Sequence, residues 1–260
     1  MIKGPVWNEQ DLARHNVFPT VLAIGDSWFW YLKGNLPLTL HPILNQRRQH
    51  IMLVRGANGA EASDFVTEPI WSQMAWDLDR TRGYGNTIQA VFLSGGGNDL
   101  AGPDDFVPLL QPDCSSATQA RQCFQPGEPA ALFSKVTTAL ARVITLVQQK
   151  IPGTPVFVHG YDYANPNGRG FLGLGQWLKV PMDLCGVPVA LHQEVVNHCI
   201  DGYWQELLAL RARFPGVLHL VDLRGTLKPA DWANELHPRP AGFKRLAQRW
   251  QPVLQQAGIA

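Results

Sequence analysis

The sequence has no long uninterrupted apolar run and almost no excess charge. No stretch approaches the roughly 18 apolar residues that a membrane-spanning helix needs, and Met1–Thr20 has no apolar segment behind basic residues, as a secretory signal would. Its 22 Lys and Arg residues nearly balance 21 Asp and Glu residues, so no strong field attracts nucleic acid or anionic lipid. We therefore expect a cytoplasmic protein with no nucleic-acid partner and no membrane span, and we seek its partner among small molecules. The oligomeric state is left open.

Cysteine is scarce, and several common binding motifs are missing. None of the four cysteines belongs to a Cys-x-x-Cys pair, so neither zinc nor a thioredoxin-like redox site is indicated, and we expect no metal or cofactor. The spacing leaves two local disulfides open, Cys114–Cys123 and Cys185–Cys199, beside the alternative of reduced thiols. No nucleotide-binding glycine motif lies between a strand and a helix, and no serine has the Gly-x-Ser-x-Gly surround of an α/β-hydrolase.

Short apolar runs alternate with longer periodic segments along the chain. The runs are Val21–Ile24, Ile51–Val54, Ile88–Leu93, Val156–Val158 and Val217–Val221. Three segments have apolar residues at helical spacing: Leu132, Val136, Leu140, Val143 and Val147; Val196, Ile200, Tyr203, Leu207 and Leu210; and Phe243, Leu246, Ala247 and Trp250. Strands separated by helices predict an α/β fold, a three-layer αβα sandwich around a five-stranded, mostly parallel sheet. At 260 residues the chain fits one domain, 1–260.

Two segments without this alternation predict loop insertions, near 101–128 and near 161–186. The first is rich in Pro, Gln and Ser, and the second contains Asn-Pro-Asn-Gly and a glycine-rich run from Gly168 to Gly175. Long loops in a compact domain are usually functional or disordered. Ligands of open parallel sheets bind at the carboxyl ends of the strands, so we expect the second segment, which follows the fourth strand, to form a wall of the pocket.

Polar residues and glycines follow the first three strands, and a histidine lies near the carboxyl end of the chain. In order they are Gly25-Asp26-Ser27, Gly59, Gly96-Gly97-Asn98-Asp99 and His237-Pro238. Together, in this order, the blocks resemble those of the SGNH (GDSL) hydrolases, and the match covers most of the chain. The resemblance implies the flavodoxin-like SGNH hydrolase fold and hydrolysis of esters at a catalytic serine.

Each of these residue types has a chemical reason to be present. A serine hydroxyl becomes a good nucleophile when an imidazole accepts its proton, and His237 is the best base for Ser27 because it lies just before a helix start, at Pro238 and Pro240. Attack on an ester forms an oxyanion that needs preorganised hydrogen-bond donors. By resemblance, these donors are the N–H groups of Ser27 and Gly59 and the side-chain amide of Asn98. The other seven histidines are interpreted as core or surface residues, although His159 could line the pocket.

The sequence departs from the family pattern in two places. The acid that orients the histidine commonly lies three residues before it, where this chain has Asn234. We favour Asn234 in the place of the acid, and Asp231, Glu235 or a backbone carbonyl remain alternatives. Trp28 stands where the family often has leucine, in an aromatic run from Trp28 to Tyr31 that is typical of helix-packing core.

Four aromatic residues and the reacting groups indicate what kind of substrate the chain would bind. Aromatic residues near the carboxyl ends of the strands and on the second loop are the candidates for substrate binding: Trp28, Tyr161, Phe171 and Trp177. Hydrolysis of carboxylic esters through an acyl-enzyme is the predicted function. A carbohydrate O-acetylesterase is the alternative reaction, and a non-catalytic binding protein on the same fold is the alternative class, supported by Asn234.

Overall fold

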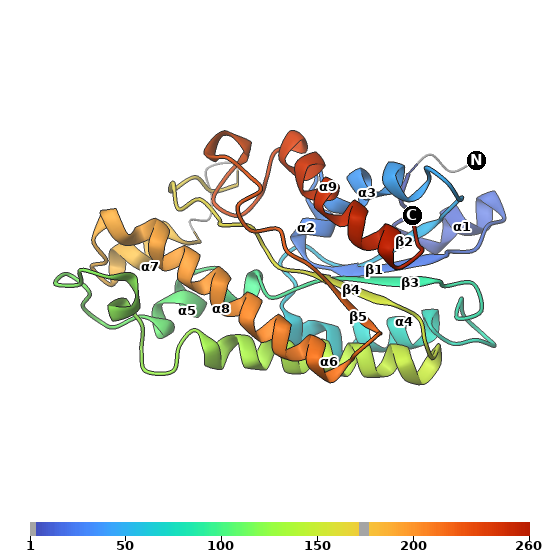
Figure 1. Cartoon of the computed structure of the whole chain (residues 1–260), viewed down its shortest axis with the longest axis horizontal. Helices are drawn as coiled ribbons and strands as arrows, with labels where there is room; N and C mark the ends of the chain where they lie inside the picture. The colour runs from blue at the N-terminus through green and yellow to red at the C-terminus, as the bar shows by residue number, and fades with distance from the viewer. Residues whose placement is uncertain (1–3, 172–176) are drawn as a thin grey trace.

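Five parallel strands form the central sheet of the computed structural model, which describes residues 4–171 and 177–260 (Figure 1). They are β1 (Val21–Gly25), β2 (Met52–Gly56), β3 (Ala90–Ser94), β4 (Val156–His159) and β5 (Leu218–Val221). Each strand begins and ends within two residues of an apolar run identified in the sequence. The five predicted strands and the parallel sheet are therefore confirmed.

The strand order is β2-β1-β3-β4-β5, which is the flavodoxin-like order. The chain reverses its direction of winding between β1 and β3. These two strands pair with each other, from Val21 opposite Ala90 to Gly25 opposite Ser94. Crevices for ligands open at such a switch point, beyond the carboxyl ends of the strands. The segments that follow β1 and β3 carry Ser27 and Asn98, so both fall at the expected edge of the sheet.

Helices cover both faces of the sheet and complete the predicted three layers (Figure 1). On one face lie α2 (Ser27–Trp30), α3 (Leu36–Leu44) and α9 (Pro240–Gln256). On the other lie α4 (Ile70–Asp77), α6 (Ala130–Lys150) and α8 (His192–Arg213), while α1 (Glu9–His15) precedes β1. The three helices expected from apolar periodicity are α6, α8 and α9, and all three are confirmed.

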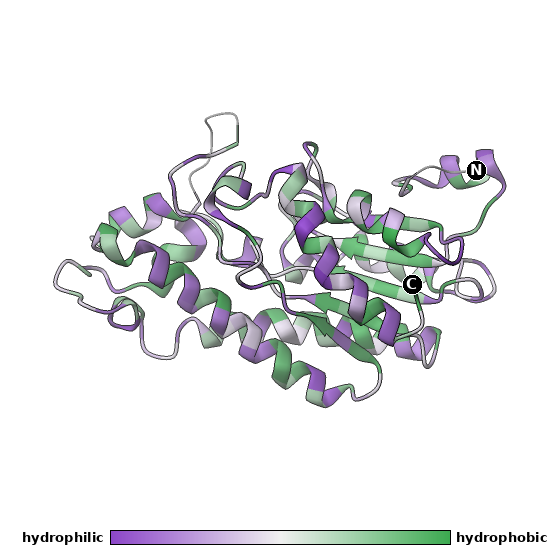
Figure 2. Ribbon diagram, turned by 45° about the horizontal axis from the view of Figure 1, so that its top comes forward, coloured by the Kyte–Doolittle hydropathy of each residue, from purple (hydrophilic) through white to green (hydrophobic). Residues whose placement is uncertain are grey.

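Burial explains why the strands are continuous apolar runs and the helices are not. Every residue of β1 and β3 is buried, as expected for strands covered on both faces. Figure 2 shows the strands as almost uniformly hydrophobic, whereas the helices mix hydrophobic and hydrophilic residues. Helix α6 meets the length and hydropathy criteria for a membrane span, but 56% of its apolar window is buried inside the molecule, so we interpret it as a core helix.

The two predicted loop insertions contain short helices. The first carries α5 (Pro103–Phe106) and the 3-10 turns η3 (Val107–Leu109) and η4 (Ala120–Cys123), and the second carries α7 (Lys179–Leu184). Apolar side chains such as Phe106 and Leu110 anchor the first segment in the core, a contact that its polar composition concealed. The other 3-10 turns are η1 (Ala62–Val66), η2 (Asn98–Leu100), η5 (Val189–Leu191) and η6 (Pro229–Asp231). All four cysteines are free and buried.

Candidate active site

Ser27 is the first residue of α2, and only Asp26 separates it from the end of β1. Asp26 caps this short helix, because its Oδ1 accepts the N–H of Trp28 at 2.9 Å. Gly25 is needed at the end of the strand, since a Cβ there would lie 2.6 Å from the Phe29 ring and 2.9 Å from Cβ of Ser94. The turn thus presents the Ser27 hydroxyl at the carboxyl edge of the sheet.

His237 reaches Ser27 across 210 residues of sequence. Its Nε2 lies 2.8 Å from Oγ of Ser27, and its ring stacks on Tyr31 with centroids 4.2 Å apart and an angle of 8° between the planes. Trp177 meets the same ring edge to face at 5.9 Å. His237 is only 6% exposed, and burial lowers its pKa to about 4, so the imidazole is neutral at pH 7 and can accept a proton.

Asn234 occupies the position behind the imidazole. Its Oδ1 accepts the backbone N–H of His237 at 2.7 Å and that of Leu236 at 3.0 Å, and lies 3.1 Å from Nδ1 of His237. Two backbone donors identify this atom as the amide oxygen, so Nδ1 carries the proton and Nε2 is left as the acceptor facing Ser27. The structure thus brings together the three residues predicted from the sequence.

The other two candidates for the acid bind elsewhere. Asp231 accepts the N–H of Lys228 at 2.9 Å and lies 3.4 Å from Nε of Arg245. Glu235 is fully buried and accepts four backbone N–H groups, those of Gly168, Trp177, Leu178 and Lys179, at 2.6–3.1 Å. This carboxylate joins the two flanks of the second insertion to the loop that carries His237, a role that the sequence did not indicate.

The three predicted oxyanion donors line one cavity. Gly59 and Asn98 line the same cavity as Ser27 and His237. Gly59 has a φ of +79°, a conformation that favours glycine, and the Asn98 amide is held by a 2.8 Å bond from Nδ2 to the carbonyl of Ala60. A side-chain amide has two N–H groups, so Asn98 keeps one for a ligand. Within residues 4–171 and 177–260 we find no protein acceptor for the N–H of Ser27 or Gly59.

A buried polar network lies under the nucleophile. Oδ1 of Asp26 accepts the hydroxyl of Ser94 at 2.7 Å, and Oδ2 accepts the hydroxyl of Tyr161. Burial raises the pKa of Asp26, although these hydrogen bonds lower it, and burial raises the pKa of Tyr161 well above its usual range. The network links the carboxyl ends of β1, β3 and β4 and was not predicted, because a lone Ser and Tyr carry no motif.

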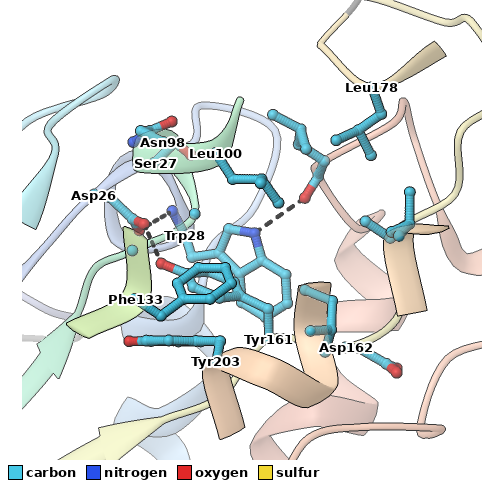
Figure 3. Close-up of a pocket in the computed structure, with 16 residues that line it drawn as sticks. Asp26, Ser27, Trp28, Asn98, Leu100, Phe133, Tyr161, Asp162, Leu178 and Tyr203 are labelled. Atoms are coloured by element: carbon cyan, nitrogen blue, oxygen red, sulfur yellow. Dashed lines mark hydrogen bonds between the residues drawn. The ribbon is translucent and has the colours of Figure 1, made fainter. Parts of the chain in front are cut away.

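Two cavities meet at Ser27. The inner cavity lies between the ends of the strands and helices α6 and α8 (Figure 3); its apolar wall includes Leu100, Phe133, Leu178, Val196, Ile200 and Leu236. The outer cavity is lined by Tyr31, Leu32, Phe171 and Trp177, together with His237 and Gly59. Ser27, Asn98 and Leu236 belong to both.

The four predicted substrate-binding residues divide between these cavities. Trp28 and Tyr161 line the inner cavity, and Phe171 and Trp177 line the outer one. Trp28 is only 3% exposed and stacks on His159, so its predicted place in the helix-packing core is confirmed. His159 itself lines neither cavity. The predicted pocket wall also included residues 172–176, which lie outside the described residues.

Comparison with known proteins identifies the fold. No family model matches the sequence, and no curated protein matches it. Among solved structures, a lipase described as GDSL-like from Parabacteroides merdae has a TM-score of 0.54 at 13% identity, covering 94% of this chain and 98% of its own. An extracellular lipase from Streptomyces rimosus has a TM-score of 0.53 at 15% identity, covering 92% and 99%. A protein from Streptococcus pneumonia described as a platelet activating factor has a TM-score of 0.58 at 18% identity, covering 94% and 90%.

These similarities extend over nearly the full length of each chain. The fold is therefore that of the SGNH/GDSL hydrolases, as the sequence blocks predicted. Among residues 4–171 and 177–260 there is no group of three or more His, Cys, Asp or Glu side chains placed to hold a metal ion.

Proposed function

We propose that this chain is a serine esterase that hydrolyses carboxylic esters through an acyl-enzyme. The observation that carries the proposal is the continuous chain of contacts from Ser27 Oγ through the ring of His237 to Asn234 Oδ1, at 2.8 and 3.1 Å. A hydroxyl, a neutral base and a group that fixes its tautomer are the parts that nucleophilic catalysis at serine requires.

The first half of the reaction forms the acyl-enzyme. Oγ of Ser27 attacks the ester carbonyl while its proton moves to Nε2 of His237. The carbonyl oxygen becomes an oxyanion, which the N–H groups of Ser27, Gly59 and Asn98 stabilise. When the intermediate collapses, the C–O bond to the alcohol breaks, and His237 returns the proton to the departing alkoxide oxygen.

The second half regenerates the enzyme. A water molecule gives a proton to Nε2 of His237 and attacks the acyl carbon, and the same three donors hold the second oxyanion. The C–O bond to Ser27 then breaks, His237 protonates Oγ, and the carboxylic acid leaves. Asn234 supplies no charge to the imidazolium formed in each half, so its contribution is to hold the ring and its tautomer.

Carbohydrate O-acetyl hydrolysis is the second candidate. Three aromatic side chains line the outer cavity, Tyr31, Phe171 and Trp177, and aromatic rings offer flat faces against which a sugar can pack. The same Ser27 and His237 would carry out this reaction, so the second candidate is the case in which the acyl group is acetyl and the leaving alcohol is a sugar.

Hydrolysis of p-nitrophenyl esters, followed by absorbance, tests the proposal. We expect turnover by the wild type and its loss in Ser27→Ala, by about 10³-fold or more. Ser63→Ala, at an exposed serine of η1, is the matched control and should keep full activity. Turnover that persists in Ser27→Ala contradicts the proposal, and absence of turnover on both p-nitrophenyl esters and acetylated sugars favours a binding protein.

A further inference from the structure

The inner and outer cavities differ in one decisive residue. Both contain Ser27 and Asn98, but His237 lines only the outer cavity. Figure 3 shows Ser27 and Asn98 on one side of the inner cavity and Leu178 on the other. A substrate bound at Ser27 therefore has two different spaces available, of which only one gives access to the base.

The chemistry assigns the two halves of an ester to these two spaces. His237 has to protonate the leaving oxygen, so the alcohol must depart on the side where Nε2 of His237 lies, which is the outer cavity. The oxyanion points to its three donors, and the acyl chain takes the remaining direction from the tetrahedral carbon. We propose that the inner cavity is the acyl-binding site and that it restricts the enzyme to short acyl groups; this inference rests on the proposed esterase function.

The wall of the inner cavity suits an alkyl chain because its polar groups already bind one another. The Tyr161 hydroxyl donates to Asp26, the Trp28 indole N–H donates to the carbonyl of Leu236 at 3.0 Å, and the Tyr203 hydroxyl donates to the carbonyl of Gly95 at 2.6 Å. A polar acyl group would find few free partners there and would lose its hydration. An alkyl chain would gain from contact with this apolar wall.

The size of the inner cavity sets the limit. Its volume is about 40 Å³, against about 260 Å³ for the outer cavity. About 40 Å³ is a small cavity beside the roughly 150 Å³ of one that binds benzene, so we expect room for acyl chains of roughly two to four carbon atoms. The far wall consists of buried side chains on α8, Val196 at 1% and Ile200 at 7% exposure, and packed helices do not move aside at low cost.

The larger outer cavity then receives the alcohol. Tyr31 and Phe171 line this cavity and meet edge to face at 5.8 Å, and Nζ of Lys33 lies 5.6 Å from the centre of the Phe171 ring. This aromatic wall fits an alcohol larger than the acyl group. The substrate class is therefore a short-chain acyl ester of a bulky, ring-containing alcohol.

A series of p-nitrophenyl esters from acetate to octanoate, compared by kcat/KM, tests this assignment, because the leaving group is constant. The wild type should act best between acetate and butyrate and lose about tenfold or more at hexanoate, which is the scale of discrimination by one or two misplaced methylene groups. Val196→Ala should enlarge the cavity and raise the hexanoate-to-acetate ratio about tenfold. Ala164→Leu, at a small residue of the cavity wall, should lower the butyrate-to-acetate ratio by a similar factor.

Val195→Ala is the matched control, because Val195 is also fully buried on α8 but does not line the cavity. It removes the same atoms and should leave the ratios of the wild type unchanged. Two results would overturn the acyl assignment. One is a wild type that prefers octanoate. The other is an equal hexanoate-to-acetate ratio in Val196→Ala and Val195→Ala, together with an unchanged butyrate-to-acetate ratio in Ala164→Leu. Ser27→Ala is measured in parallel. If it is inactive while the chain-length ratios of the cavity variants equal those of the wild type, only the acyl assignment fails. Turnover that does not depend on Ser27 overturns both proposals.

Discussion

Oδ1 of Asn234 lies 3.1 Å from Nδ1 of His237, so an uncharged amide oxygen, and not a carboxylate, orients the imidazole that faces Ser27. The same oxygen accepts the backbone N–H groups of Leu236 and His237, which fixes its own position. The contact preserves the tautomer that catalysis needs but leaves the imidazolium without a neighbouring negative charge. Burial lowers the pKa of His237, and no charge at position 234 offsets that effect.

We expect activity to persist into acid. The base must be neutral, and burial lowers the pKa of His237 to about 4, so kcat/KM should fall only as the pH approaches that value. Asn234→Asp places a negative charge beside the ring, which raises the pKa of His237 by roughly one unit or more. The acid limb of the kcat/KM profile should therefore move to higher pH in this variant. A limb at the same pH in both proteins, with folding checked by circular dichroism at each pH, would exclude His237 as the titrating base.

Asn98→Ala should affect the chemical step more than binding. Loss of one oxyanion donor costs about 10²–10³ in kcat in serine hydrolysis, with a smaller change in KM. Steady-state kinetics on one ester measures both constants. Asn86→Ala removes an exposed amide that lines neither cavity and should leave kcat close to that of the wild type. Equal losses in the two variants would argue against Asn98 as a donor to the oxyanion.

Glu235→Gln should destabilise the protein. Each carboxylate oxygen of Glu235 accepts two backbone N–H groups, and glutamine would turn an NH₂ group toward one of these pairs. Leaving two buried donors unpaired costs about 2–5 kcal/mol, which urea denaturation can measure. Glu194→Gln, at an exposed position on α8, is the control with the same chemical change. Equal stability of the two variants would mean that the four bonds contribute nothing to the folded state.

The sequence was sufficient to predict the sheet and to select the residues that we propose to react. Strands buried on both faces must be continuous apolar runs, and each residue proposed to react lies in a short block beside a strand end or a helix start. Ser27, Gly59, Asn98 and His237 could therefore be identified one block at a time, and Asn234 by its distance from His237.

The contacts between distant segments could not be predicted. Tyr31 stacks on His237, and Glu235 binds residues 56–67 positions away, but neither pairing has a local pattern. The division into two cavities depends on side chains from α6, α8 and the second insertion meeting at one place. Such contacts follow from the packing of the whole chain, whereas periodicity reports only which face of one element is buried.

Covalent labelling is the most direct test of the central claim that Ser27 is a nucleophile activated by His237. The protein is incubated with a p-nitrophenyl alkylphosphonate, which traps an activated serine, and is then analysed by intact-mass and peptide mass spectrometry. We predict one adduct on Ser27, formed at least about 10²-fold more slowly in His237→Ala and absent from Ser27→Ala. An adduct on another residue, or labelling of Ser27 at the same rate without His237, would contradict it.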